Sequence, residues 1–345
     1  MCRNTRQSAP FWEALILSLL VWFAPTIGVS GDAYVAEFLD LPVDARSVTF
    51  GVNVIVLDKQ AASVFANPAN VVWGNVSQIQ FTYGSLYGGF SSGLAAHQGF
   101  FARVPLKGGA GLGLAIVRFA VDDIPRYGAL GSASFAERLE GAAELPISTP
   151  LGTFSDNEIA LVAAFGRSFP LHLALNWFVE KIDLFPYVGV DFKMLFQSLD
   201  RFSAHGVGFD AGVGMKVDLR QFSDVWWLGR MNLAWVGRDL GNTTLIWNNR
   251  ARQSRFYSWT WGFSYQLTVA GSVETGWYWQ QAPGRDLPGA LGLEFGCRSL
   301  RILLGMRERR LGFAFGIEFR RLSLGYGVGN AALGETRRFD VTWSF

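Results

Sequence analysis

Large apolar residues alternate with small or polar residues along most of the chain after residue 75. In 311–319 every second residue is Leu, Phe or Ile, and the positions between them hold Gly, Ala or Glu. The same period of two recurs in 322–328, 257–268 and 209–218. Because a β-strand points successive side chains to opposite faces, each segment has one apolar face and one polar or glycine face. The pattern predicts an all-β protein.

Two architectures use strands of this kind. A soluble sandwich or barrel buries the apolar face in its core, whereas an outer-membrane barrel turns that face to lipid and lines its lumen with small and polar residues. The segments run about nine to thirteen residues, which is the length that a tilted strand needs to cross a bilayer. Tryptophans near the segment ends, such as Trp277 and Trp279, fit an interfacial girdle. We therefore predict an antiparallel transmembrane β-barrel in contact with outer-membrane lipid.

The number of strands follows from parity and loop length. Single-chain bacterial barrels have an even number of strands, but the alternation marks fifteen segments. Tracing back from a periplasmic C-terminus makes 238–254 an external loop but places the long segment 122–156 in the periplasm. Tracing forward from 76–84 makes 122–156 external. The number of strands between 157 and 198 must therefore differ from the three segments marked there. Two strands in that region give fourteen and four give sixteen; we expect fourteen, with sixteen as the alternative. The fifteen segments are 76–84, 97–105, 109–120, 157–168, 171–180, 187–198, 205–218, 226–237, 255–268, 270–281, 288–298, 299–307, 310–319, 320–328 and 336–345.

The chain ends on such a strand. Val341, Trp343 and Phe345 alternate with polar residues. A terminal phenylalanine on an alternating strand is similar to the signal that the outer-membrane insertion machinery reads. We predict that these three residues form the insertion signal.

Residues 1–30 have the three parts of a secretory signal peptide. Arg3 and Arg6 form a basic start, 14–23 an apolar centre, and 28–30 a small-residue exit. The alternative is a first helix of the mature fold, but the apolar run is too short to span a bilayer. We predict cleavage, which removes Cys2, and three regions: signal peptide 1–30, plug segment 31–75, and barrel 76–345.

The segment that precedes the barrel carries a helix start. Asn67 is a suitable N-cap, Pro68 suits the first helical position, and Ala69 follows. A segment of this size with a short helix can fill the lumen of a barrel. We predict a plug; the alternative is a periplasmic tail.

Composition and charge narrow the function. Forty glycines and 17% charged residues argue against a helical bundle and against disorder. The net charge of +2 without a basic stripe predicts no nucleic-acid partner. Some charged residues fall on the polar face, where pairing within a wet lumen is one interpretation and a ligand path is another. These residues are Asp210, Lys216, Glu294, Glu318 and Arg320.

Motifs for enzyme chemistry lack their context. Residues 89–93 satisfy G-x-S-x-G, but that pattern needs the strand-to-helix turn of an α/β sheet. The three histidines are isolated and have no zinc-ligand spacing. We predict no catalytic residue, no metal site and no cofactor. The alternative is a barrel lipase whose Ser and His meet only in space.

Several short motifs resemble the PorV/PorQ family, within the wider group of FadL-like outer-membrane barrels. They are Phe38-Leu39, Ala45-Arg46, Asp58, Ala61-Ala62, Asn67-Pro68-Ala69, Asp123-Ile124-Pro125, Gly152-Thr153-Phe154-Ser155, Gly208 to Gly212, and the ending from Arg307 to Phe345. The resemblance covers essentially the whole mature chain and implies fourteen strands and a plug. The chain departs from the family at 171–186, which looks inserted, and at Val52-Asn53-Val54.

Three function classes fit these observations. The resemblance implies a type IX-like secretion component that handles exported proteins together with other secretion subunits. A FadL-like passive conduit for hydrophobic small molecules is the alternative, and a general diffusion porin is the third. The sequence does not separate the first two, because both share the plug motif and the barrel.

Overall fold

The computed structural model describes residues 35–89, 93–127, 150–175, 179–222, 225, 227–269, 273–282, 287–331 and 334–345. Contacts divide the chain into 1–30 and 31–345, and the described residues all belong to the second part. The predicted signal peptide, most of the predicted loop 122–156, and the centre of the G-x-S-x-G pattern lie outside the described residues.

Fourteen antiparallel strands close into a barrel, because the first and last strands pair with each other. Gln78 lies opposite Ser344 and Ser85 lies opposite Arg337 in this closing pair. The prediction of a fourteen-stranded all-β barrel is confirmed. The barrel strands are β1 (Gln78–Leu86), β2 (Ala95–Pro105), β3 (Ala110–Arg126), β4 (Gly152–Ser168), β6 (Val179–Leu199), β7 (Phe202–Asp218), β8 (Arg230–Arg238), β11 (Ser258–Val269), β12 (Val273–Ala282), β13 (Leu287–Cys297), β14 (Leu300–Arg307), β15 (Arg310–Phe319), β16 (Leu322–Ala331) and β17 (Gly334–Ser344).

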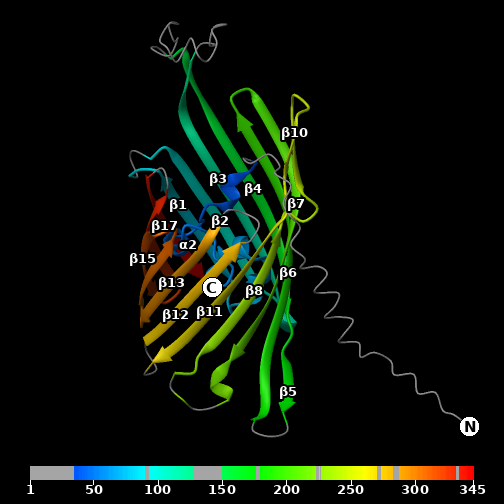
Figure 1. Cartoon of the computed structure of the whole chain (residues 1–345), viewed down its shortest axis with the longest axis vertical. Coiled ribbons are helices and arrows are strands. Elements are labelled where there is room, and N and C mark those ends of the chain that lie inside the picture. The colour runs from blue at the N-terminus through cyan, green and yellow to red at the C-terminus, as the bar shows by residue number, and fades with distance from the viewer. Residues whose placement is uncertain are drawn as a thin grey trace, which may run out of the picture. The chain divides into compact units, whose positions relative to one another are not determined.

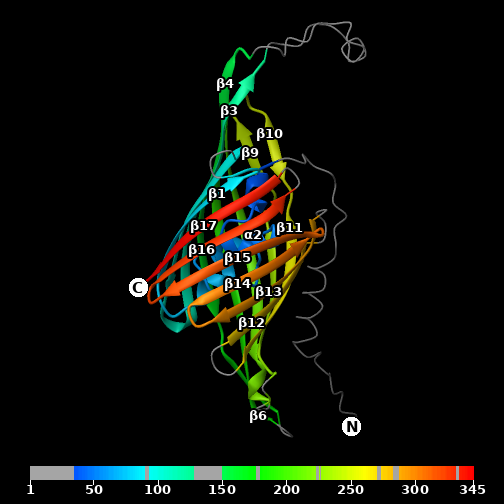
Figure 2. The same ribbon diagram turned by 90° about the vertical axis from the view of Figure 1, so that its left-hand side faces the viewer.

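Three further strands extend the barrel without enlarging it. β5 (Leu171–Leu175) pairs only with the first part of β6, while the rest of β6 pairs with β4. The segment 171–180 is therefore not a separate spanning strand, which is why fifteen segments give fourteen barrel strands. β9 (Thr243–Trp247) and β10 (Arg252–Arg255) form a hairpin that continues beside β7. Figures 1 and 2 show these extensions beyond the shorter strands β11–β17.

The apolar face of the strands points out of the barrel. In β15, Leu311 and Phe319 are 69% and 67% exposed, whereas Gly312 and Ala314 between them are buried. The outer surface of the barrel is therefore apolar, as an outer-membrane barrel requires. Val341, Trp343 and Phe345 lie on this same outer face, on or just after β17. Their role as an insertion signal stays a prediction.

The barrel has two ends, which we name from the chain. The C-terminal rim carries Phe345 and the turns at 106–109, 298–299 and 320–321. The opposite rim carries the turns at 200–201 and 308–309 and the β9–β10 hairpin.

Residues 35–75, here called the N-terminal segment, lie inside the ring of strands (Figures 1 and 2). Most of the side chains between Val35 and Val71 are buried. The segment contains η1 (Glu37–Asp40), α2 (Ala45–Phe50), α3 (Ser63–Ala66) and η2 (Pro68–Val72). Asp44 begins α2 as the N-cap of a capping box with Ser47, and Gly51 ends it at a φ of 65°. None of the described helices is long and apolar enough to cross a membrane.

Candidate functional site

A row of glycines across four strands receives α2. Gly292, Gly305, Gly312 and Gly329 are direct partners on β13, β14, β15 and β16. A Cβ at Gly305 or Gly312 would lie 2.3 Å from the carbonyl oxygen of Thr49. The helix therefore lies so close to the wall that only glycine fits at these positions.

A second glycine row receives η2 on the other side of the lumen. Gly111, Gly166, Gly189 and Gly212 are partners on β3, β4, β6 and β7. A Cβ at Gly189 would lie 2.5 Å from both N and Cα of Ala69. The two rows account for part of the high glycine content, because each one fits a helix of the N-terminal segment.

Replacing Gly189 by Ala should loosen η2 without opening the barrel. The added Cβ meets backbone, which cannot rotate away, and such overpacking costs about 1–3 kcal/mol. We expect protease cleavage within residues 60–75 to begin at a lower urea concentration. Gly296→Ala on β13 is the matched control, since its Cβ would meet only the flexible tip of Arg301 at 3.3 Å and Glu274 at 3.6 Å. Equal protease resistance of both variants would show that the close packing of η2 against Gly189 does not stabilise the segment.

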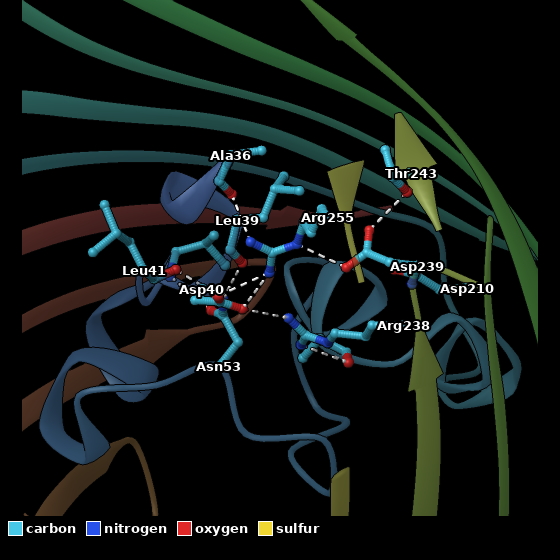
Figure 3. Close-up of polar contacts among 12 residues, drawn as sticks. Ala36, Leu39, Asp40, Leu41, Asn53, Asp210, Arg238, Asp239, Thr243 and Arg255 are labelled. Atoms are coloured by element: carbon cyan, nitrogen blue, oxygen red, sulfur yellow. Dashed lines mark hydrogen bonds and ion pairs between the residues drawn. The ribbon is translucent and has the colours of Figure 1, made fainter. Parts of the chain in front are cut away.

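Arg255 of the β9–β10 hairpin joins the N-terminal segment to the barrel (Figure 3). Its Nη2 donates to both carboxylate oxygens of Asp40 at 2.8 Å, and its Nη1 donates to the carbonyls of Val35 and Ala36 at 3.1 and 3.0 Å. Its Nε donates to Asp239 at 2.7 Å. Every N–H of this buried guanidinium therefore has a partner.

The same ion pairs continue into the wall. Lys193 of β6 lies 2.6 Å from both Asp239 and Asp210. Asp210 also accepts the backbone N–H of Asp239 at 2.7 Å. We call Asp40, Lys193, Asp210, Asp239 and Arg255 the Arg255 cluster. It connects η1, the loop after β8, the hairpin and two wall strands.

Replacing Arg255 by Met should release the start of the N-terminal segment. The change leaves the carboxylate of Asp40 without its nearest cation and that of Asp239 with Lys193 alone, and breaking a buried ion pair by removing one partner costs about 3–5 kcal/mol. We expect faster hydrogen exchange at residues 35–45. Arg252→Met, an exposed position on the same strand, is the control. Unchanged exchange in the Arg255 variant would contradict the anchoring role.

Acid should weaken the same attachment. Burial alone would raise the pKa of Asp239, but Lys193 and Arg255 lower it to about 2. A carboxylate whose folded pKa is lowered stabilises the fold above its ordinary value of about 4, and that contribution is lost as the pH falls toward 2. Hydrogen exchange at residues 35–45, corrected for the intrinsic rate, should accelerate between about pH 4 and pH 2. Asp239→Asn should flatten this dependence, and constant protection down to pH 2 in the unchanged chain would contradict it.

A second attachment holds the middle of the segment. Asp58 pairs with Lys216 of β7, whose ammonium lies 3.5 Å from the centre of the Trp73 ring. Burial would raise the pKa of Asp58, but Lys216 and Arg103 hold it below the ordinary value. Arg103 of β2 donates to the Asp58 carbonyl at 2.6 Å.

A third attachment fixes α2. Arg46 Nη2 lies 2.6 Å from Glu294 of β13, and Tyr278 of β12 also donates to this carboxylate. Burial would lower the pKa of Arg46, but Glu294 raises it above the usual range. Arg301 of β14 contacts Glu294 at 3.3 Å.

Wall side chains also bind the backbone of the segment. Asp340 accepts the Ala45 N–H at 2.8 Å, and Gln80 accepts that of Ala62 at 2.8 Å. Gln280 accepts from Ile55 and donates to Asn53, at 2.8 and 3.0 Å. These bonds satisfy peptide groups that the irregular segment cannot pair within itself.

Two apolar clusters lie between these polar attachments. One cluster joins the segment to the long strands β2–β7 and the hairpin; its wall members are Phe101, Ala115, Val117, Ala160, Val162, Ala164, Leu195, Ala204 and Leu245. A second cluster joins 50–57 to β8 and β12–β15. By contrast, the inner faces of β17, β1 and β2 are polar, with Arg338, Asp340, Gln80, Thr82 and His97 buried there.

The predicted plug motif lies against the second glycine row. Asn67 is fully buried; its Oδ1 accepts the Ala69 N–H at 2.9 Å and its Nδ2 donates to Ile55 at 3.2 Å. Pro68 occupies the first position of η2. Closure of the lumen to solutes by this segment stays a prediction.

Four of the five predicted polar-face residues point into the barrel, but they do not pair with one another. Asp210 binds Lys193, and Lys216 binds Asp58. Glu294 binds Arg46, and Glu318 binds Arg301. Arg320, the fifth, does not lie on the inner face of a strand but at the C-terminal rim. β15 ends at Phe319, and Arg320 lies exposed in the turn at a φ of 52°, with its guanidinium 5.7 Å from the Phe319 ring. The alternation was extended one residue too far.

The sequence did not reveal the Arg255 cluster. Asp239 follows β8 in a predicted polar loop, where an exposed side chain is expected, yet it is fully buried. Asp40 lies before the predicted helix start at Asn67, so no pattern singled it out. Within the described ranges, no group of three or more His, Cys, Asp or Glu side chains could hold a metal ion.

The sequence matches no protein-family model and no curated protein. Among solved structures, the chain is similar to the toluene transporter TodX of Pseudomonas putida, with 12% identity over 88% of this chain and 96% of that one, at a TM-score of 0.43. The toluene transporter TbuX of Ralstonia pickettii is 11% identical over 89% and 98% (TM-score 0.46), and a FadL homologue of Pseudomonas aeruginosa is 8% identical over 88% and 98% (TM-score 0.46). With TM-scores below 0.5, these likenesses do not establish a family for the chain.

Proposed function

We propose that this chain is an integral barrel of the bacterial outer membrane that admits small hydrophobic molecules, and that the N-terminal segment closes it. The apolar outer face fits lipid, and the closed sheet leaves no unpaired strand edge in the hydrocarbon. The C-terminal rim would then face the periplasm.

The observation that carries this proposal is the apolar cluster along the long strands. It reaches from Leu245 of the hairpin at the opposite rim to Val71, which packs against Gly166 toward the C-terminal rim. A general diffusion porin has a polar, water-filled interior instead. An apolar wall favours solutes that lose little by leaving water.

Passage requires movement of the N-terminal segment, because its own side chains occupy this wall. Phe38, Val64 and Phe65 are buried members of the same cluster. When they separate from the wall, the apolar surface that they leave is the surface that a hydrophobic solute can cover. The glycine rows and the Arg255 cluster set the cost of that separation.

A disulfide between the segment and β3 tests this mechanism. A Cβ at Gly113 would lie 3.2 Å from Cβ of Val64, close to the roughly 3.5–4.5 Å of disulfides. The variant Gly113→Cys/Val64→Cys also carries Val71→Ala, because Val71 Cγ1 would lie 2.8 Å from the new Cβ, and Cys297→Ala, because Cys297 is free and exposed.

The measurement is uptake of radiolabelled toluene by a Gram-negative host without its own hydrophobic channels. We expect background uptake from the oxidised variant and recovered uptake after reduction, so that one protein is its own control. Either single-cysteine variant should be insensitive to reduction. Equal uptake by the oxidised and reduced forms would overturn the proposal.

The secretion role that the PorV/PorQ resemblance implies stays a prediction, as do signal-peptide cleavage and reading of the C-terminal strand by the insertion machinery. No contact among the described residues favours an exported protein as partner. Co-purification of secretion subunits from outer membranes, together with unchanged toluene uptake when the gene is deleted, would favour that role over the conduit.

A further inference from the structure

A cavity of about 240 Å³ opens at the C-terminal rim between the N-terminal segment and the strands β14–β17. We call it the rim pocket. The segment contributes Arg46, Lys59 and Gln60, and the wall contributes Arg301 and Thr342. None of the functions considered above uses this space.

Buried polar atoms with no partner line the rim pocket. Arg46 Nε, Gln60 Oε1 and Thr342 Oγ1 form no hydrogen bond within the described part of the chain. Arg46 and Thr342 are only 7% and 2% exposed. Leaving such groups unsatisfied costs about 1–3 kcal/mol each. The pocket therefore presents two unused donors, Arg46 Nε and the Thr342 hydroxyl, and one unused acceptor, Gln60 Oε1.

The charge around the pocket is positive. Five cations line the pocket. Only three carboxylates line it or pair with these cations. The cations are Arg46, Lys59, Arg301, Arg320 and Arg321, and the carboxylates are Glu274, Glu294 and Glu318. Arg320 and Arg321 in the β15–β16 turn form no ion pair with other described residues. An anion entering here would meet two uncompensated guanidiniums first.

Part of the lining is apolar. Leu303 and Ala314 line the pocket next to the polar atoms, and the half-buried Leu322 adds apolar surface that a ligand can cover. A hydrated inorganic ion gains nothing from such a surface, whereas an organic molecule with an apolar body does.

We propose that the rim pocket binds a small organic anion, a carboxylate on a compact apolar body. The carboxylate accepts from Arg46 Nε and Thr342 Oγ1, in charge-assisted bonds that are about twice as strong as neutral ones. The body lies on Leu322, beside Leu303 and Ala314. Arg321 attracts the ligand at the entrance. This site is separate from the apolar wall along β2–β7.

Benzoate and benzamide, which differ mainly in charge, are the probes. Calorimetry on the full barrel in phosphatidylcholine nanodiscs should show benzoate binding at least about tenfold more tightly than benzamide. Thr342→Val keeps the side-chain shape and removes the donor, and Arg321→Gln removes the entrance charge. Each should weaken benzoate binding by about threefold to tenfold. Arg309→Gln, in the corresponding turn at the opposite rim, should change nothing.

Benzamide binding as tightly as benzoate would overturn the proposal. So would equal binding of inorganic phosphate, because the apolar lining would then play no part, or an unchanged benzoate affinity in the Thr342 variant. The double variant Thr342→Val/Arg321→Gln should leave toluene uptake unchanged. A failure of the pocket is therefore distinguishable from a failure of the conduit.

Discussion

Removal of residues 46–72 should raise the permeability of the inserted barrel to small solutes by roughly tenfold or more, since fourteen strands enclose more space than wall side chains alone can fill. The deletion removes α2 and η2, which cover the two glycine rows. The wall itself does not depend on them, because β1 pairs with β17 along its backbone. Swelling of liposomes in arabinose measures the change.

A weaker variant should give an intermediate result. Asn67→Ala removes the cap of η2, which costs about 0.5–2 kcal/mol, and leaves the rest of the segment in place. We expect permeability between that of the intact chain and that of the deletion. An inserted deletion variant with unchanged permeability would show that other residues close the lumen and that the segment is not its plug.

Deletion of residues 336–345 should reduce the folded, heat-modifiable barrel to below about a tenth of its normal amount, because each unpaired backbone group in lipid costs several kcal/mol. The deletion leaves the edges of both β1 and β16 without a partner strand. It also removes the Asp340 and Arg338 bonds to the N-terminal segment. Heat-modifiable migration of outer-membrane fractions measures the outcome.

The terminal residue can be tested separately from the strand. Phe345→Ala keeps the bond from its N–H to the Ser77 carbonyl, so a loss of assembly would report reading of the side chain rather than loss of pairing. Phe319→Ala is the matched control, an exposed phenylalanine at the end of β15 on the same rim. Normal assembly of both the truncated chain and the Phe345 variant would exclude the insertion signal.

The sequence predicts the barrel wall well because the relevant pattern is local. Alternation over nine or more residues is visible in any window, so Leu311 and Phe319 are assigned to the outer face without knowledge of their neighbours. The pattern marks 171–180 but does not show that β5 pairs only with the start of β6, and β9 and β10 are too short to be separated from a loop.

The contacts inside the barrel are not local and could not be predicted in the same way. Arg255 meets Asp40 across 215 positions, and Ala45 meets Asp340 across 295. A buried aspartate such as Asp239 and an exposed one look alike in a sequence. The glycine rows are partly visible in the sequence, because each row takes one glycine from each of four strands. Which glycines lie side by side depends on the register of the strands, which the sequence does not show.

The glycine rows also impose an order on folding. Each row exists only after four strands have paired in register, and the row that receives α2 extends to Gly329, close to the end of the chain. The N-terminal segment is synthesised before any of these strands, yet it has no complete docking surface until the last ones have joined. Such long-range contacts form slowly, because loop closure must come before they stabilise anything. The N-terminal segment can therefore dock in two steps: η2 can reach its row once β3, β4, β6 and β7 have paired, whereas α2 must wait until β16 has joined β15.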